Sequence, residues 1–308
     1  MTRAGWVLVG ATGCGKSAVA QWLAEKWGRT EIWSADSMAV YRGMDVGTAK
    51  TPEGERAGVV YRGIDLADPD RAFSVADWLA ALRDGAQSGA EALVVGGTGL
   101  YVRALTEGLD AGGGGDPEAR AEAEALLAER GRGGLEAAVR QMNPAEFAKV
   151  RDPENPRRLV RAYELFKRGE PWPAATERPR PELVGLRREP EDLRARLARR
   201  VRRMFADGLV EEVRELRRHR PELSETARHA IGYEEAARVL DGTMGEEEAI
   251  AATTLRTRQY AKRQATWFRH QARVAWVDAG ADEPLERVAS RVERTLRSKG
   301  RAGFAGLL

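Results

Sequence analysis

Short apolar runs, each followed by a polar or glycine-rich turn, mark the first third of the chain. They cover residues 6–9, 31–35 and 92–95, and helix-like patterns lie between them. A fourth run, ELVGL at residues 182–186, has the same character. Apolar runs of four or five residues between helices are typical of buried parallel strands. The pattern predicts an α/β fold built on a parallel sheet.

Residues that can do chemistry stand directly after the first three runs. Residues 13–17 lie in the turn after the first run, Asp36 follows the second, and Thr98 ends a Gly-Gly-Thr turn after the third. In open parallel sheets, ligands bind outside the carboxyl ends of the strands. We therefore expect these three segments to meet in one crevice.

The stretch between the third and fourth runs differs in composition. Four consecutive glycines at 112–115 interrupt the chain, and the sequence after them is charged and helix-forming. Prolines at positions 171, 173, 179 and 181 close this stretch. We predict a discontinuous core of residues 1–112 and 181–308, with a helical insertion of residues 113–180.

The rest of the chain is expected to be mostly helical. Apolar periodicity predicts helices over residues 191–218, 232–240 and 246–268. The tail after Ala279 carries no chemical signal.

Composition narrows the class of protein. The chain has 308 residues, of which 43% are hydrophobic, as in an ordinary globular protein. No apolar run approaches the ~20 residues needed to cross a bilayer, and the N-terminal residues lack the layout of a signal peptide. The single cysteine, Cys14, excludes internal disulfides and a thiolate metal cluster. We expect a soluble, cytoplasmic protein without a membrane partner.

The formal net charge is only +3, but the charge is unevenly distributed. Residues 249–277 contain six Lys or Arg and no Asp or Glu. Such a stretch beside phosphate chemistry indicates a polyanionic partner. A solvated helix face is the alternative, and charge alone does not decide between the two.

The turn after the first strand fits a phosphate-binding loop. Its sequence, GATGCGKS, matches the pattern G-x-x-x-x-G-K-[ST] between a strand and a helix. The expected phosphate-binding residues are Gly10, Ala11, Thr12, Gly13, Cys14, Gly15, Lys16 and Ser17. The glycines let backbone N–H groups turn inward around phosphate oxygens, and the following helix presents its positive end. Lys16 would reach the terminal phosphates, and the Ser17 hydroxyl would bind Mg²⁺.

This loop by itself leaves the reaction open. An ATPase or a small-molecule kinase would use Asp36 to hold Mg²⁺. A diphosphate leaving group on another molecule would suit the loop equally well, because the loop recognises a diphosphate as such. Cys14 could be a thiol of low pKa near the helix start, but we interpret it as a small side chain that fits the loop.

Six further segments decide between these reactions. They are ADSMAVYRGMDVGTAK (35–50), GGTGLYVRAL (96–105), NPRRLVRAYELF (155–166), RRVRRMFADGLVEEV (199–213), AIGYEE (230–235) and TRQYAKRQATWFR (257–269). In this order they resemble the signature segments of tRNA dimethylallyltransferases. Six independent motifs in the right order are not expected from chance.

The resemblance implies a specific reaction and fold. A P-loop NTPase-like core would bind dimethylallyl diphosphate with Mg²⁺, and a helical insertion would grip the anticodon stem-loop of tRNA. The five-carbon group would go to N6 of the adenosine 3′-adjacent to the anticodon, at tRNA position 37, in tRNAs that read codons starting with U. The target base would be flipped out into one end of a channel. We expect the protein to act as a monomer.

Elementary chemistry agrees with these roles. The N6 amine of adenine is a weak nucleophile, and a carboxylate within hydrogen-bond reach can accept its proton as the C–N bond forms. Asp36 is the candidate for this base. Lys16, Mg²⁺ on Ser17 and backbone dipoles would neutralise the leaving diphosphate. The resemblance adds Thr12 and Thr98 as residues that orient the substrates.

Further contacts follow from the resemblance and from the acid-free stretch. Arg200 matches the family's diphosphate-contacting arginine, with a surface arginine in a run of arginines as the alternative. The predicted tRNA contacts are Asp36, Ser37, Met38, Ala39, Arg157, Arg158, Leu159, Val160, Arg161, Arg228, Gly232, Tyr233, Lys262 and Arg263. Trp267 could stack on a base, but core packing is the favoured interpretation.

One position departs from the family pattern. Ala39 stands where the family usually has a glutamine, whose amide would bind a base next to the target. We expect this contact to be lost, so that base discrimination is altered while the transfer chemistry is kept.

Three other functions remain as alternatives. An adenylate isopentenyltransferase would use the same loop and acid on a free nucleotide, but the helical insertion and the acid-free helix argue against it. A P-loop kinase would need a phosphoryl acceptor and usually an arginine-bearing lid. A non-catalytic RNA-binding module would bind tRNA without turnover.

Overall fold

The computed structural model describes residues 4–307 apart from 109–114, 151, 174–179 and 221. The chain divides into two compact units, one of Met1–Gly108 with Pro179–Leu308 and the other of Leu109–Arg178. These limits lie close to the boundaries expected for a core and a helical insertion.

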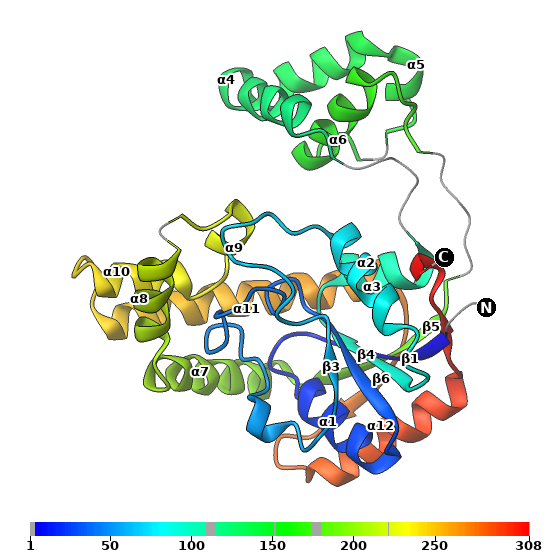
Figure 1. The fold of residues 1–308 in the computed structure, drawn as a ribbon, viewed down its shortest axis with the longest axis vertical. Helices are drawn as coiled ribbons and strands as arrows, with labels where there is room; N and C mark the ends of the chain where they lie inside the picture. Colours follow the sequence, from blue (N-terminus) through cyan, green and yellow to red (C-terminus); the bar gives the residue numbers. More distant parts are fainter. Residues whose placement is uncertain (1–3, 109–114, 151, 174–179, 221, 308) are drawn as a thin grey trace. The chain divides into compact units, whose positions relative to one another are not determined.

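A seven-stranded sheet forms the centre of the first unit (Figure 1). Its strands are β1 (Ala4–Val9), β2 (Thr30–Ala35), β3 (Tyr61–Arg62), β4 (Glu91–Gly96), β5 (Glu182–Arg188), β6 (Arg273–Ala279) and β7 (Ala302–Gly303). Their order is β3-β2-β4-β1-β5-β6, with all neighbours parallel, and β7 pairs antiparallel with β1. The expected α/β fold and the four expected strands are confirmed.

Three strands were not among those expected. β3 and β7 have two residues each, which is too short for a periodic signal. β6 contains the apolar run VAWV at 274–277 and was missed, although it is an edge strand and most of its residues are partly or fully exposed. Each of its seven residues pairs in parallel register with a residue of β5. This pairing defines the strand.

Helices cover both faces of the sheet. The helices of this unit are α1 (Lys16–Trp27), α2 (Val75–Gly85), α3 (Gly99–Glu107), α7 (Pro190–Ala206), α8 (Leu209–His219), α9 (Glu225–Arg228), α10 (Tyr233–Leu240), α11 (Glu246–Gln271) and α12 (Leu285–Lys299), with 3-10 turns at Glu53–Glu55 and Ala305–Leu307. α1 and α12 pack on one face through Val19, Leu23, Val288 and Val292. Figure 1 shows α2, α3 and α11 on the other side of the strands.

The helix expected over residues 191–218 is wrong in one respect. The structure divides it into α7 and α8 at Gly208, whose φ of 100° is left-handed. Glycine adopts that conformation without the steric cost that a side chain adds, so the chain turns there and a new helix begins. The helices expected over 232–240 and 246–268 are confirmed as α10 and α11.

The second unit is helical and has its own core. It contains α4 (Pro117–Met142), α5 (Pro144–Phe147) and α6 (Pro156–Lys167). Each helix begins with a proline after an Asp or Asn whose side chain accepts backbone N–H groups, which is a strong start signal. Leu135 and Val139 of α4 pack with Leu159 and Leu165 of α6.

Among the described helices, none is both long enough and apolar enough to cross a bilayer.

Candidate active site

The turn between β1 and α1 has the geometry of a phosphate-binding loop. Gly13 and Gly15 have φ values of 79° and 100°, which residues with a side chain rarely adopt. The loop closes on itself through the Cys14 N–H, which donates to the Ala11 carbonyl at 3.3 Å. The Lys16 ammonium donates to the same carbonyl at 3.3 Å, so it already lies over the loop. Cys14 is 1% exposed, which supports its interpretation as a small side chain that fits.

The expected convergence at the strand ends occurs. A single pocket is lined by Thr12, Lys16 and Ser17 of the loop, by Asp36 at the end of β2, and by Arg200 of α7. The segment after Asp36 contributes a further wall, which includes Ala39, Thr48, Lys50 and Thr51.

Asp36 presents a carboxylate to this pocket. Its Oδ1 accepts a hydrogen bond of 2.9 Å from the Met38 N–H, which fixes the plane of the group. Within the described part of the chain, no hydrogen-bond donor reaches the other oxygen, Oδ2. The carboxylate is therefore oriented and still able to accept a proton.

Thr98 fixes the segment that carries Asp36. Its N–H donates to the Ala35 carbonyl at 3.1 Å, and its Oγ1 accepts from the Ser37 N–H at 3.1 Å. Thr98 therefore joins the ends of β2 and β4. Thr98 itself is not among the residues that line the pocket, whose wall at the end of β4 is Val95 and Gly96.

Tyr260 of α11, which the sequence analysis did not single out, lies near Asp36 but is not among the residues that line the pocket. Burial, with the nearby negative charge of Asp36, raises the pKa of its hydroxyl to about 12. Tyr260 therefore stays protonated and can donate a hydrogen bond beside Asp36.

Arg200 is bound to the phosphate loop and is not a free surface arginine. One guanidinium nitrogen donates to Thr12 Oγ1 at 3.1 Å, and the other donates to the Thr48 carbonyl at 3.3 Å. Its Nε is buried and has no hydrogen-bond acceptor among the described residues. Burial lowers the pKa of Arg200, although the Asp36 charge opposes this change. A buried donor without an acceptor beside a phosphate loop indicates a site for an anionic oxygen.

Two more arginines hold the loop through its carbonyl groups. Arg188 Nε donates to the Cys14 carbonyl at 2.8 Å, and Arg196 Nε donates to the Gly13 carbonyl at 3.2 Å. The sequence analysis assigned neither residue. Arg188 ends β5 and Arg196 lies on α7, four residues before Arg200, but only their contacts with the loop identify them.

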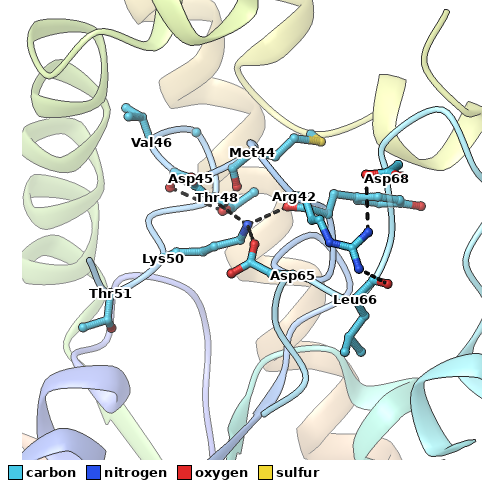
Figure 2. Close-up of polar contacts among 12 residues, drawn as sticks. Arg42, Met44, Asp45, Val46, Thr48, Lys50, Thr51, Asp65, Leu66 and Asp68 are labelled. Carbon is cyan, nitrogen blue, oxygen red and sulfur yellow. Dashed lines mark hydrogen bonds and ion pairs between the residues drawn. The ribbon is translucent and has the colours of Figure 1, made fainter. Parts of the chain in front are cut away.

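Lys50 anchors the segment that follows Asp36. Its side chain is only 4% exposed, and its ammonium donates to the Tyr41 carbonyl at 2.5 Å and to Asp45 and Asp65 at 2.6 Å each (Figure 2). Three donors and three acceptors satisfy the buried charge completely. The pocket wall is therefore rigid at Lys50.

Comparison with known proteins agrees with this geometry. A family model described as IPP transferase matches residues 39–271. The chain is 42% identical over 300 residues to a tRNA dimethylallyltransferase of Kineococcus radiotolerans, covering 92% of this chain and 94% of that protein. It is 41% identical over 281 residues to one from Salinispora arenicola, covering 88% and 81%. The chain belongs to the IPP transferase family.

Solved structures give the same fold. The tRNA isopentenylpyrophosphate transferase of Bacillus halodurans superposes on this IPP transferase with a TM-score of 0.67 at 34% identity, covering 96% of this chain and 98% of that one. A eukaryotic dimethylallyltransferase, solved acting on tRNA, has a TM-score of 0.73 at 22% identity and covers 96% and 80%. That second likeness supports the fold alone.

In the first unit of this IPP transferase, the predicted RNA contacts differ in accessibility. Arg228, Lys262 and Arg263 are exposed, and Ser37 and Met38 are partly exposed. Gly232 and Tyr233 are buried, and the Tyr233 side chain is 3% exposed. The ring of Trp267 lies against Gly99 and contacts Phe268 edge-on at 5.0 Å, but it is only partly buried, so its expected core role stays a prediction.

In the second unit, the predicted stretch 157–161 lies on α6. Arg157 is exposed, and Arg158 and Arg161 are partly exposed. Leu159 and Val160 are 0% and 5% exposed and belong to the core of this unit. A side-chain contact of Leu159 or Val160 with RNA is therefore wrong, because helical periodicity turns these two residues inward.

Proposed function

We propose that this protein transfers a dimethylallyl group from dimethylallyl diphosphate to N6 of adenosine 37, next to the anticodon, in tRNAs that read codons starting with U. The names of its relatives support the reaction class. The observation that carries the proposal is that Asp36, Arg200 and the phosphate loop line one pocket. The acceptor for the N6 proton and the binding site for the leaving diphosphate therefore lie in the same pocket.

The acceptor side of the reaction falls to Asp36. The bond between N6 and C1 of the prenyl group forms while the bond between C1 and the diphosphate oxygen breaks. The electron pair of that bond leaves with the diphosphate, and the N6 proton passes to Asp36. A general base of this kind contributes about 10²–10⁴-fold to a rate. Met38 and Thr98 hold the carboxylate and its segment in place.

The donor side falls to Lys16, Arg200 and the loop N–H groups. Negative charge grows on the diphosphate as the C1–O bond breaks, so fixed positive groups stabilise the transition state more than the ground state. Arg200 is held by Thr12 and Thr48 and lines the pocket, so its positive charge lies beside the leaving group.

The pocket also suits an apolar donor. Besides the polar residues, its wall includes Ile32, Ile64 and Val95 together with Ala39. A five-carbon prenyl group gains free energy when it leaves water for such a wall. The phosphoryl acceptor of a kinase does not require such an apolar wall, so the wall favours a prenyl donor.

Ser17 fits a role in holding Mg²⁺. Its side chain is exposed in the pocket at the start of α1. The described residues contain no group of three or more His, Cys, Asp or Glu that could hold a metal ion by themselves. Mg²⁺ in phosphate sites commonly takes one protein ligand together with phosphate oxygens and water. When bound there, it supplies positive charge to the leaving diphosphate.

The test is incubation of the protein with labelled dimethylallyl diphosphate, Mg²⁺ and unmodified tRNA, followed by nucleoside analysis. We expect label in N6-dimethylallyladenosine at position 37 alone. Equal labelling of AMP would instead indicate an adenylate isopentenyltransferase. Transfer of the γ-phosphoryl group from ATP to an added acceptor, with formation of ADP, would indicate a kinase.

A further inference from the structure

One carboxylate outside the pocket holds three consecutive backbone groups of the pocket wall. Glu212 of α8 accepts hydrogen bonds from the N–H groups of Asp45 and Val46 on Oε2, at 2.8 and 2.7 Å. Its Oε1 accepts from the Gly47 N–H at 3.2 Å. Bonds to an ionised carboxylate are about twice as strong as neutral ones, so this contact fixes the path of residues 45–47.

The same carboxylate is held from its other side by Tyr233. The Tyr233 hydroxyl donates to Glu212 Oε1 at 2.6 Å. Burial, together with the Glu212 charge, raises the pKa of this hydroxyl well above its usual value, so it remains a donor. A Cβ added to Gly47 would overlap the Tyr233 ring, which shows how closely the segment is seated against α10.

The residue after this segment is in contact with the diphosphate site. The Thr48 carbonyl accepts from Arg200, and Arg200 donates to Thr12 of the phosphate loop. The position of the Arg200 guanidinium therefore depends on where the peptide of residue 48 lies. Lys50 fixes the chain two residues later (Figure 2), so Glu212 and Lys50 hold Thr48 between two anchors.

We propose that Glu212 is a positioning residue for the transfer reaction: it sets the Thr48 carbonyl, and through it the Arg200 guanidinium, against the departing diphosphate. This inference rests on the proposed function for the identity of the ligand. Tyr233 acts one step further out by orienting Glu212. The role accounts for the short hydrogen bond between the partly exposed Glu212 and the buried Tyr233.

A double-mutant cycle on pyrophosphate binding tests this role. The dissociation constant of pyrophosphate with Mg²⁺ is measured by calorimetry for wild type, Glu212→Gln, Arg200→Met and the double variant. We expect Glu212→Gln to weaken binding about tenfold, because an amide cannot accept from all four donors. If Glu212 acts through Arg200, the double variant binds no more weakly than Arg200→Met alone. Additive losses would overturn the proposal.

Two further variants provide a control and an independent test of the same contact. Glu215→Gln, on the same helix but paired with Arg218 at the surface, is expected to leave binding unchanged. Tyr233→Phe keeps the ring against Gly47 and removes only the hydroxyl, and we expect a loss of about threefold. Should Glu212→Gln not fold, as judged by circular dichroism, the cycle of Tyr233→Phe with Arg200→Met decides in its place.

The two hypotheses can fail separately. Wild-type protein that binds pyrophosphate but transfers no prenyl group to tRNA contradicts the proposed function, while the cycle still reports on Glu212. Wild-type protein that transfers the group, with pyrophosphate binding unaffected by Glu212→Gln and by Tyr233→Phe, contradicts the positioning role alone.

Discussion

Gln264 Oε1 accepts a hydrogen bond of 2.8 Å from the backbone N–H of Thr12, across 252 residues of sequence. The Gln264 side chain is buried, and its amide nitrogen lies directly against Gly97 in the turn after β4. One side chain of α11 therefore joins the phosphate loop to the neighbouring strand end. The shape of the loop depends on a helix near the other end of the chain.

Replacing Gln264 tests this connection. Gln264→Leu leaves the Thr12 N–H buried without an acceptor, which costs about 1–3 kcal/mol. We expect a lower midpoint of thermal unfolding and a raised KM for dimethylallyl diphosphate. Gln259→Leu, at an exposed position of the same helix, serves as the control. An unchanged KM in Gln264→Leu would mean that the loop keeps its shape without this bond.

Asp36→Asn separates catalysis from binding. The amide has the shape of the carboxylate but cannot accept the N6 proton, so we expect kcat to fall by about 10²–10⁴-fold. Binding of an anticodon stem-loop RNA, followed by fluorescence anisotropy, is expected to change little. Asp70→Asn, an exposed acid, should leave both quantities unaltered. Full activity of Asp36→Asn would remove Asp36 from the mechanism.

Ala39→Gln tests the departure from the family pattern. Ala39 is 6% exposed and lines the pocket. A glutamine there offers an amide to the base beside the target. We expect the ratio of kcat/KM between stem-loops that differ only at that base to rise by about two- to tenfold. Ala39→Leu, similar in bulk without the amide, controls for size, and equal ratios in both variants would contradict a hydrogen-bonding role.

The exposed bases of α11 test the RNA surface. Lys262→Ala and Arg263→Ala each remove one positive charge from a helix stretch without acids. If each charge contacts a phosphate, the slope of log K for tRNA against log salt falls by about 1 per variant. Arg71→Ala removes an exposed charge elsewhere and is expected to leave the slope unchanged. If all three variants keep the wild-type slope, the RNA binds to another surface.

Glu293 makes the stability of the first unit depend on pH. Burial opposes ionisation of Glu293, but hydrogen bonds from Lys26, Trp27 and Arg297 prevail and lower its pKa to about 2. A carboxylate with a depressed pKa stabilises the fold above its unfolded pKa of about 4.3, and this contribution is lost as the pH falls from there towards 2.

Urea unfolding of Glu293→Gln checks this pH dependence. At pH 7 we expect a loss of about 2 kcal/mol in the free energy of unfolding, since charged hydrogen bonds between α1 and α12 are removed. The difference from wild type should shrink as the pH falls below 4. Glu286→Gln, exposed on α12, is the control. A difference that stays constant between pH 7 and pH 3 would contradict the assigned cause.

Local pattern was sufficient for the parts of this protein that form within short stretches of chain. The four buried strands follow from continuous apolar runs, and the phosphate loop follows from glycines at positions that need positive φ. The meeting of residues 13–17 with Asp36 follows as well, because parallel strands end at one edge of a sheet. In the insertion, by contrast, the predicted tRNA contacts include Leu159 and Val160, although helical periodicity alone places both residues in a core.

The sequence by itself determined the class of fold, the loop and the position of its acid, since each depends on residues that are neighbours along the chain or on the rule that parallel strands share an edge. The family resemblance already pointed to Arg200, but tertiary structure alone decided that Arg200 binds Thr12, that Gln264 holds Thr12, and that Glu212 holds residues 45–47. These pairs are separated by 165 to 252 residues, and a side chain carries no mark of a partner so distant. Only the packing of the helices on the sheet brings donor and acceptor within 3 Å or so of each other.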